Sequence, residues 1–174
     1  MPLALLRRNA LLSFLLCLFA NQALAIPGDI YLHLYASQHS WDNRSVFGHA
    51  FMCVSYHLRS GIKEECFGFY PKSETKMLVG GPGLALNEAI AKKPVRFGAG
   101  EITAEVAKKV TSETIRSVLA LGNEWNAKEY VLANSNCIDF VHAVASLLGL
   151  KRPARSVLQT PTAYVKALEQ ANPD

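Results

Sequence analysis

The sequence lacks a strong excess of either charge. It contains 18 basic and 14 acidic side chains among 174 residues, so a nucleic-acid-binding function that depends on a basic surface is not expected. The nucleotide-binding patterns GxxxxGK[ST] and GxGxxG are also missing. The metal-binding patterns HExxH, HxH and CxxC are missing as well. We therefore expect neither a nucleotide cofactor nor a bound metal.

A second long apolar run is also lacking, and the one present has the organisation of a signal peptide. Arg7 and Arg8 precede the apolar segment 10–20, and Ala23-Leu24-Ala25 has the small-x-small pattern of a cleavage site. The run is far shorter than the roughly 20 apolar residues that span a bilayer, so we expect cleavage rather than a stable membrane anchor. Residues 1–25 are then the signal peptide. Residues 26–174 form a single domain in the periplasm or outside the cell, with 16 basic against 14 acidic residues.

Cysteine is scarce, and its number after cleavage is odd. Of four cysteines, Cys17 lies in the leader, so Cys53, Cys66 and Cys137 remain. Three cysteines cannot all pair. The remaining thiol in an exported protein is either an intermolecular crosslinker or a reactive group.

The first half of the mature chain has the alternating pattern of β-strands. Residues 29–36 predict one strand, residues 37–45 a polar loop, and residues 46–70 a β-hairpin that turns at Arg59 and Ser60. In that register Cys53 lies opposite Cys66. A disulfide and a pair of small buried thiols both fit this placement, and either leaves Cys137 unpaired.

The second half is predicted to be mainly helical. A glycine-rich turn at residues 80–83 precedes a short helix over 84–92 and a strand-like piece at 95–97. Thr103 is the predicted N-cap of a long helix that ends near Trp125. A further helix begins at Cys137 and ends at Gly149, and a last one spans 162–170. Strands followed by helices indicate an α+β fold, with an antiparallel sheet packed against helices.

Cys137 is placed where a thiol becomes a nucleophile. The first turn of a helix carries the positive end of the helix dipole and free backbone N–H groups, which lower a thiol pKa. The same N–H groups can stabilise an oxyanion. Asp139 lies about 200° further around the helix, so we expect it to stabilise the helix N-terminus and not to contact a catalytic base.

The general base has to come from elsewhere in the chain. His49 is the first choice, because it follows Gly48 within an apolar strand, where an ionisable group needs a reason. His39, in the predicted loop, comes second and His33 third. His57 belongs to the hairpin turn, and His142 is rotated away from Cys137 on the same helix and is expected to be a packing or solvent residue.

Three short motifs resemble a known family. They are FGHAF at residues 47–51, GFYP at residues 68–71 and NCIDFV at residues 136–141. Together they resemble the circularly permuted papain-like fold, that is, the NlpC-type clan, which includes lecithin:retinol acyltransferase-like proteins. In that clan a strand carrying Gly-His precedes a helix that starts with Asn-Cys. The resemblance extends from about Ile30 to Thr160-Pro161.

The resemblance implies a thiol hydrolase or acyltransferase in which Cys137 attacks a carbonyl and His49 transfers the proton. Members often have a third polar residue that orients the imidazole. Tyr70, opposite His49 in the predicted register, is our choice for it, although a Cys-His dyad is also consistent. Asn134 or Asn136 is expected to support the oxyanion hole.

Export and this resemblance together favour amide bonds of peptidoglycan peptides as the substrate, with targeting to the wall by the same domain or by a partner. Two alternatives remain open from the sequence. One is acyl transfer or lipid or thioester hydrolysis. The other is an exported binding module without catalysis, in which Cys137 is a buried helix-start thiol.

Overall fold

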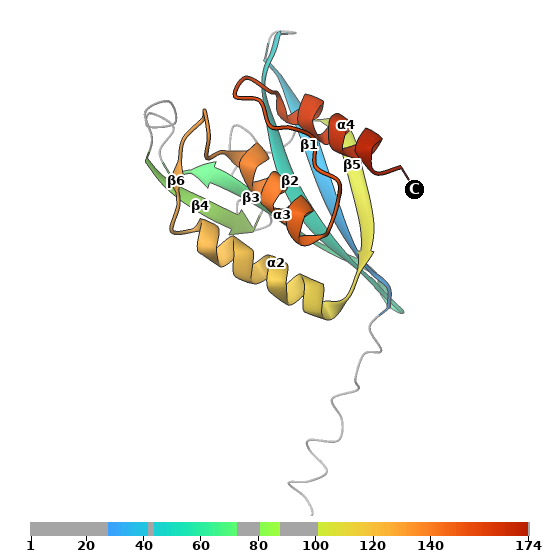
Figure 1. The fold of residues 1–174 in the computed structure, drawn as a ribbon. Helices are drawn as coiled ribbons and strands as arrows, with labels where there is room; N and C mark the ends of the chain where they lie inside the picture. Colours follow the sequence, from blue (N-terminus) through green and yellow to red (C-terminus); the bar gives the residue numbers. More distant parts are fainter. Residues whose placement is uncertain (1–27, 42–43, 73–80, 88–100, 174) are drawn as a thin grey trace, which may run out of the picture.

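The computed structural model describes residues 28–41, 44–72, 81–87 and 101–173. The predicted leader and the strand-like piece at 95–97 lie outside these residues. In the described part, six strands form one antiparallel sheet in the order β5-β1-β2-β3-β4-β6. Three helices pack on one face of the sheet (Figure 1). This arrangement confirms the α+β prediction of an antiparallel sheet packed against helices.

The strands are β1 (Ile30–Trp41), β2 (Arg44–Leu58), β3 (Gly61–Pro71), β4 (Gly81–Asn87), β5 (Glu101–Val110) and β6 (Glu129–Tyr130). The helices are α2 (Ser112–Trp125), α3 (Cys137–Leu147) and α4 (Pro161–Ala171). None of the helices in these ranges is long and apolar enough to cross a membrane.

Alternation along β1, which lies between β5 and β2, determines which face of the strand is buried. Leu32 and Leu34 are fully buried against the helices, whereas His33 and Tyr35, on the other face, are half-buried. The strand continues to Trp41 and β2 already begins at Arg44. The loop predicted over residues 37–45 was therefore wrong, because backbone pairing with β2 extends the ladder through this polar stretch.

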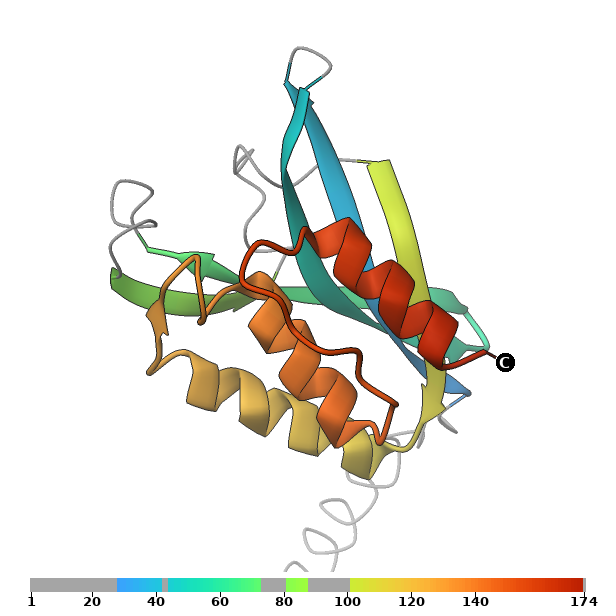
Figure 2. The same ribbon diagram turned by 45° about the horizontal axis from the view of Figure 1, so that its top comes forward.

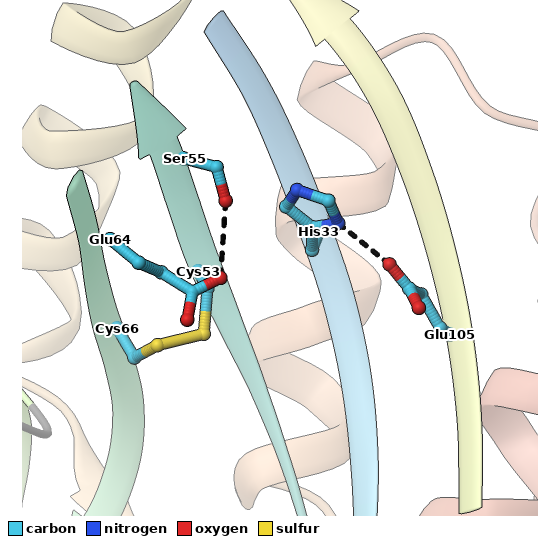
Figure 3. Close-up of a disulfide and its surroundings, with 6 residues drawn as sticks. All are labelled: His33, Cys53, Ser55, Glu64, Cys66 and Glu105. Carbon is cyan, nitrogen blue, oxygen red and sulfur yellow. Dashed lines mark hydrogen bonds and ion pairs between the residues drawn. A yellow bond between two sulfur atoms is a disulfide. The ribbon is translucent and has the colours of Figure 1, made fainter. Parts of the chain in front are cut away.

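The hairpin formed by β2 and β3 has the predicted turn and register. Leu58 pairs with Gly61 around the two-residue turn, and Cys53 pairs with Cys66. The two sulfur atoms are joined in a disulfide (Figure 3). Of the two arrangements that the sequence left open, the structure therefore has the bridged one.

Two helix predictions in the second half were wrong. Residues 81–87 form β4, which pairs with the end of β3, so the glycine-rich cluster begins a strand and the helix predicted over 84–92 does not form in its described part. Residues 101–110 form β5, which pairs with β1. Val106 and Val110 are four residues apart, and an even spacing places both on one face of a strand as well as of a helix.

The helix predicted from Thr103 begins instead at Ser112. Thr111 is the N-cap, and its hydroxyl accepts a hydrogen bond from the Thr114 backbone N–H at 3.2 Å. Thr103 lies in β5, where its hydroxyl contacts the Ala36 carbonyl and the Thr162 hydroxyl. It therefore ties the sheet to α4. The predicted α3 is confirmed from Cys137, and α4 begins one residue before its predicted start.

The core lies between the sheet and the three helices. α3 packs on β2 and β3, and α4 packs on β5, β1 and β2 (Figure 2). Phe69, Phe140 and Trp125 make edge-on and tilted ring contacts there. This packing places the N-terminus of α3 beside the end of the β2–β3 ladder, where the candidate site is found.

Candidate functional site

The N-terminus of α3 is fixed by a reciprocal capping box. The Asn136 side-chain oxygen accepts hydrogen bonds from the backbone N–H of Ile138 at 2.8 Å and of Asp139 at 3.4 Å. In return, the Asp139 carboxylate accepts one from the Asn136 backbone N–H at 3.0 Å. The role expected for Asp139 at the helix N-terminus is confirmed. These reciprocal hydrogen bonds fix the first turn of the helix, so its first residue, Cys137, is held in a defined position.

His49 approaches Cys137 from β2, just beyond the point where β2 and β3 stop pairing. The β2–β3 pairing begins at Phe51 and Gly68, and β2 continues past it toward Gly48. The backbone of Ala50 there makes a hydrogen bond to the Cys137 thiol, and the His49 side chain makes another. His49 and Cys137 are each only 6% exposed.

A glycine is required at position 48 because β1 and the start of α4 come close to its backbone. A Cβ atom at this position would lie 2.6 Å from the Ser37 carbonyl oxygen and 3.5 Å from the Pro161 side chain. In the sequence, this glycine predicted that another group comes close to His49. The neighbours are β1 and the first residue of α4.

The electrostatics of the site favour the thiolate. Burial, the largest influence, raises the pKa of Cys137, but the hydrogen bond and charge of His49, the Ala50 backbone and the Tyr130 hydroxyl lower it. The lowering effects prevail, so the pKa of Cys137 lies below its ordinary value. A thiol with a depressed pKa in contact with an imidazole has the properties of a nucleophile paired with its base.

Tyr130 is a site residue that the sequence analysis missed. It lies in β6, is 5% exposed, and its hydroxyl hydrogen-bonds to Cys137. Burial and then the negative charge of Cys137 raise the pKa of Tyr130, so the phenol stays protonated and donates. No local pattern marks this residue, because β6 has two residues and is positioned only by its pairing with β4.

Tyr70 contacts His49, as the predicted register suggested. The two rings stack with centroids 4.2 Å apart, and Phe51 stacks on His49 at 5.8 Å. Stacking fixes the plane of the imidazole. A role for Tyr70 as the third catalytic residue stays a prediction.

The two asparagines expected to support the oxyanion hole are used differently. The Asn136 amide nitrogen donates to the Leu132 carbonyl at 2.5 Å, and its oxygen caps α3. Asn134 is exposed and does not line the pocket described below. Asn136 itself lines the pocket, and a role for either residue in the oxyanion hole stays a prediction. Next to the sulfur, the Tyr130 hydroxyl hydrogen-bonds to the thiol, and the Cys137 backbone N–H donates to the Tyr130 hydroxyl oxygen.

The other described histidine side chains lie away from the thiol. His33 forms an ion pair with Glu105 at 2.7 Å on the sheet face away from the helices (Figure 3). His142 contacts the Tyr164 hydroxyl at 2.8 Å, as expected of a packing residue. His57 is exposed, and its ring contacts Tyr31. His39 lies in β1 and not in a loop, and its side chain lies outside the described set.

One group of side chains within the described residues is close enough to share a metal ion. It consists of Cys53, Glu64 and Cys66. Both sulfur atoms belong to the disulfide, which removes them as thiolate ligands. This group therefore does not provide a metal site.

Cys137 and His49 line a pocket of about 280 Å³. Its walls come from the ends of β2 and β3, from Tyr130 and Leu132, from the start of α3 and from residues 157–161. Apart from the histidine and the thiol, no lining residue within the described ranges is ionisable near neutral pH. The pocket therefore combines a reactive pair with mainly uncharged, apolar walls.

Comparisons with known proteins give a structural similarity and no sequence match. No protein-family model matches the chain, and no curated protein matches its sequence. The crystal structure of TseH, a type VI secretion system effector, is similar, with a TM-score of 0.53. The two sequences are 17% identical, and the match covers 82% of this chain and 88% of that chain. At this identity the similarity supports the α+β fold alone.

Proposed function

We propose that this chain is an exported cysteine hydrolase in which Cys137 is the nucleophile and His49 the general base. The observation that carries the proposal is the buried Cys137–His49 contact, in which hydrogen bonds lower the pKa of the thiol despite burial. The placement of the pair in a pocket supports it further. A non-catalytic buried thiol would have an unperturbed or raised pKa.

The geometry suggests how the reaction proceeds. His49 takes the proton of the Cys137 thiol, the sulfur attacks the carbonyl carbon of the substrate, and the electron pair of the C=O bond moves to the oxygen to give an oxyanion. In this proposal the Tyr130 hydroxyl, which lies beside the sulfur, donates a hydrogen bond to the oxyanion. Protonated His49 then donates its proton to the leaving group as the carbon–heteroatom bond breaks. Water activated by His49 hydrolyses the acyl-enzyme and releases Cys137.

Amide bonds of peptidoglycan peptides are the first substrates to test, because residues 1–25 have the pattern of a signal peptide and the site motifs resemble those of the NlpC-type clan. The wild-type protein should release soluble peptides from purified sacculi, and Cys137→Ala should abolish the release. Ile62→Ser, on the exposed part of β3, is a matched control that should retain it. If an activity-based thiol probe labels Cys137 but no sacculus preparation releases peptides, the substrate assignment is wrong.

A second substrate class, acyl lipids or thioesters, is favoured by one observation. The described pocket wall has no lysine or arginine to pair with the carboxylates of a wall peptide. Intact-protein mass spectrometry after incubation with phospholipid tests this alternative. An acyl adduct on Cys137, absent from Cys137→Ala, supports lipid hydrolysis or acyl transfer over peptide hydrolysis.

A further inference from the structure

The connection between α3 and α4 carries two exposed apolar side chains to the mouth of the pocket. We call residues 150–160 the strap. It runs back along α3 toward the N-terminal end of that helix before α4 begins (Figure 2). Val157 and Leu158 line the pocket, yet they are 63% and 92% exposed. Because both lie at the mouth of the pocket, a ligand that covers them removes apolar surface from water, which is favourable.

Side-chain hydrogen bonds and an ion pair hold the strap in place. The Asn172 side chain hydrogen-bonds to both the N–H and the carbonyl of Lys151 at 2.8 Å. Further along, Arg155 forms an ion pair with Asp139 at 3.0 Å, and both side chains are less than 20% exposed. Because Asp139 also belongs to the capping box of α3, this ion pair fixes the strap relative to Cys137.

Turn geometry does not explain the two apolar residues. Val157 and Leu158 occupy the centre of a turn that the Gln159 N–H closes onto the Ser156 carbonyl at 3.2 Å. Gly, Pro, Asn, Asp and Ser favour such positions, whereas a β-branched valine and a leucine do not. The turn therefore presents apolar surface in a fixed position, which lowers the entropy lost when a ligand covers it.

We propose that Val157 and Leu158 form a specificity-determining rim that binds an uncharged aliphatic group of the substrate next to the scissile carbonyl. The inference rests on the proposed function, because it takes Cys137 as the reacting atom. Leu132 and Ile138 line the same pocket and extend the apolar surface inward. A carboxylate or ammonium at this place would lose water without gaining a charged partner from the described wall.

Alkylation of Cys137 tests the rim without requiring turnover. The reagents are iodoacetamide and N-butyl iodoacetamide; the sulfur forms a bond to the CH₂ carbon as the C–I bond breaks and iodide leaves. Mass spectrometry of the peptide containing Cys137 gives each rate, divided by the rate with free cysteine. Partial burial of the butyl group on the rim should accelerate N-butyl iodoacetamide about fivefold relative to iodoacetamide.

Substitution separates the rim from the reactivity of the thiol. Leu158→Ser should lower the rate ratio toward one, whereas the matched control Ile62→Ser should keep the wild-type ratio. A wild-type ratio near one, or a ratio that Leu158→Ser does not change, overturns the rim. So does a dimer, seen by analytical ultracentrifugation, that Leu158→Ser dissociates, because a second copy would then cover these residues. If Cys137 reacts with iodoacetamide no faster than free cysteine, the proposed catalysis fails, and the ratio still tests the rim.

Discussion

Removing the Cys53–Cys66 disulfide should cost about 3 kcal/mol of unfolding free energy. The bridge joins residues 13 apart in sequence, and closing a loop of about 15 residues removes close to 3 kcal/mol of conformational entropy from the unfolded chain. The native hairpin already pairs these two residues directly. The loss therefore comes chiefly from the unfolded state, and the Cys53→Ala/Cys66→Ala variant should retain the wild-type fold.

Thermal and urea unfolding followed by far-ultraviolet circular dichroism measure this loss. At roughly 2–4 °C per kcal/mol for a domain of this size, the melting temperature should fall by about 9 °C. A reductant should destabilise the wild-type protein and Cys137→Ala by the same amount but leave the double variant unchanged. A loss below about 1 kcal/mol, or a reductant effect that persists in the double variant, would refute the entropic argument.

Three further predictions concern the site and its supports. Because His49 lowers the pKa of Cys137, His49→Gln should move the pH profile of Cys137 alkylation to higher pH; an unchanged profile would mean that His49 does not stabilise the thiolate. Gly48→Ala should cost about 2 kcal/mol in urea unfolding, since the new Cβ would lie 2.6 Å from the Ser37 carbonyl oxygen; wild-type stability would contradict this close approach. Asn136→Ala removes the cap of α3 and should cost about 1–2 kcal/mol, measured in the same way, with a cost near zero arguing against the cap.

The sequence predicted the parts of the site that local patterns define. The N-cap and first turn of α3 follow from Asn136, Cys137 and the apolar stripe after them, because helix signals depend on neighbouring residues. The register of the hairpin follows from its two-residue turn, which fixes every opposite pair, including Cys53 with Cys66. His49 was chosen as an ionisable group within an apolar strand, and it does contact the thiol.

The errors arose where pairing between distant segments decides the structure. The spacing of the apolar residues within 101–110 fits a helix or a strand. The segment forms a strand because it pairs with the edge of β1. The segment 81–87 is short, with two glycines and two leucines, and it becomes a strand by pairing with the edge of β3. The oxyanion role of Asn134 or Asn136 stays a prediction; the Asn136 side chain also caps α3 and bonds to the Leu132 carbonyl.

By itself, the sequence determined an α+β chain with one unpaired cysteine at a helix start and a histidine on a strand. Each of these depends on residues close together in the chain. The tertiary structure decided which groups surround the sulfur. It brings Tyr130 to Cys137 through the pairing of β6 with β4. It also brings Leu158 to the pocket through the ion pair of Arg155 with Asp139. These contacts join segments whose proximity is set by sheet order and helix packing, which no local pattern encodes.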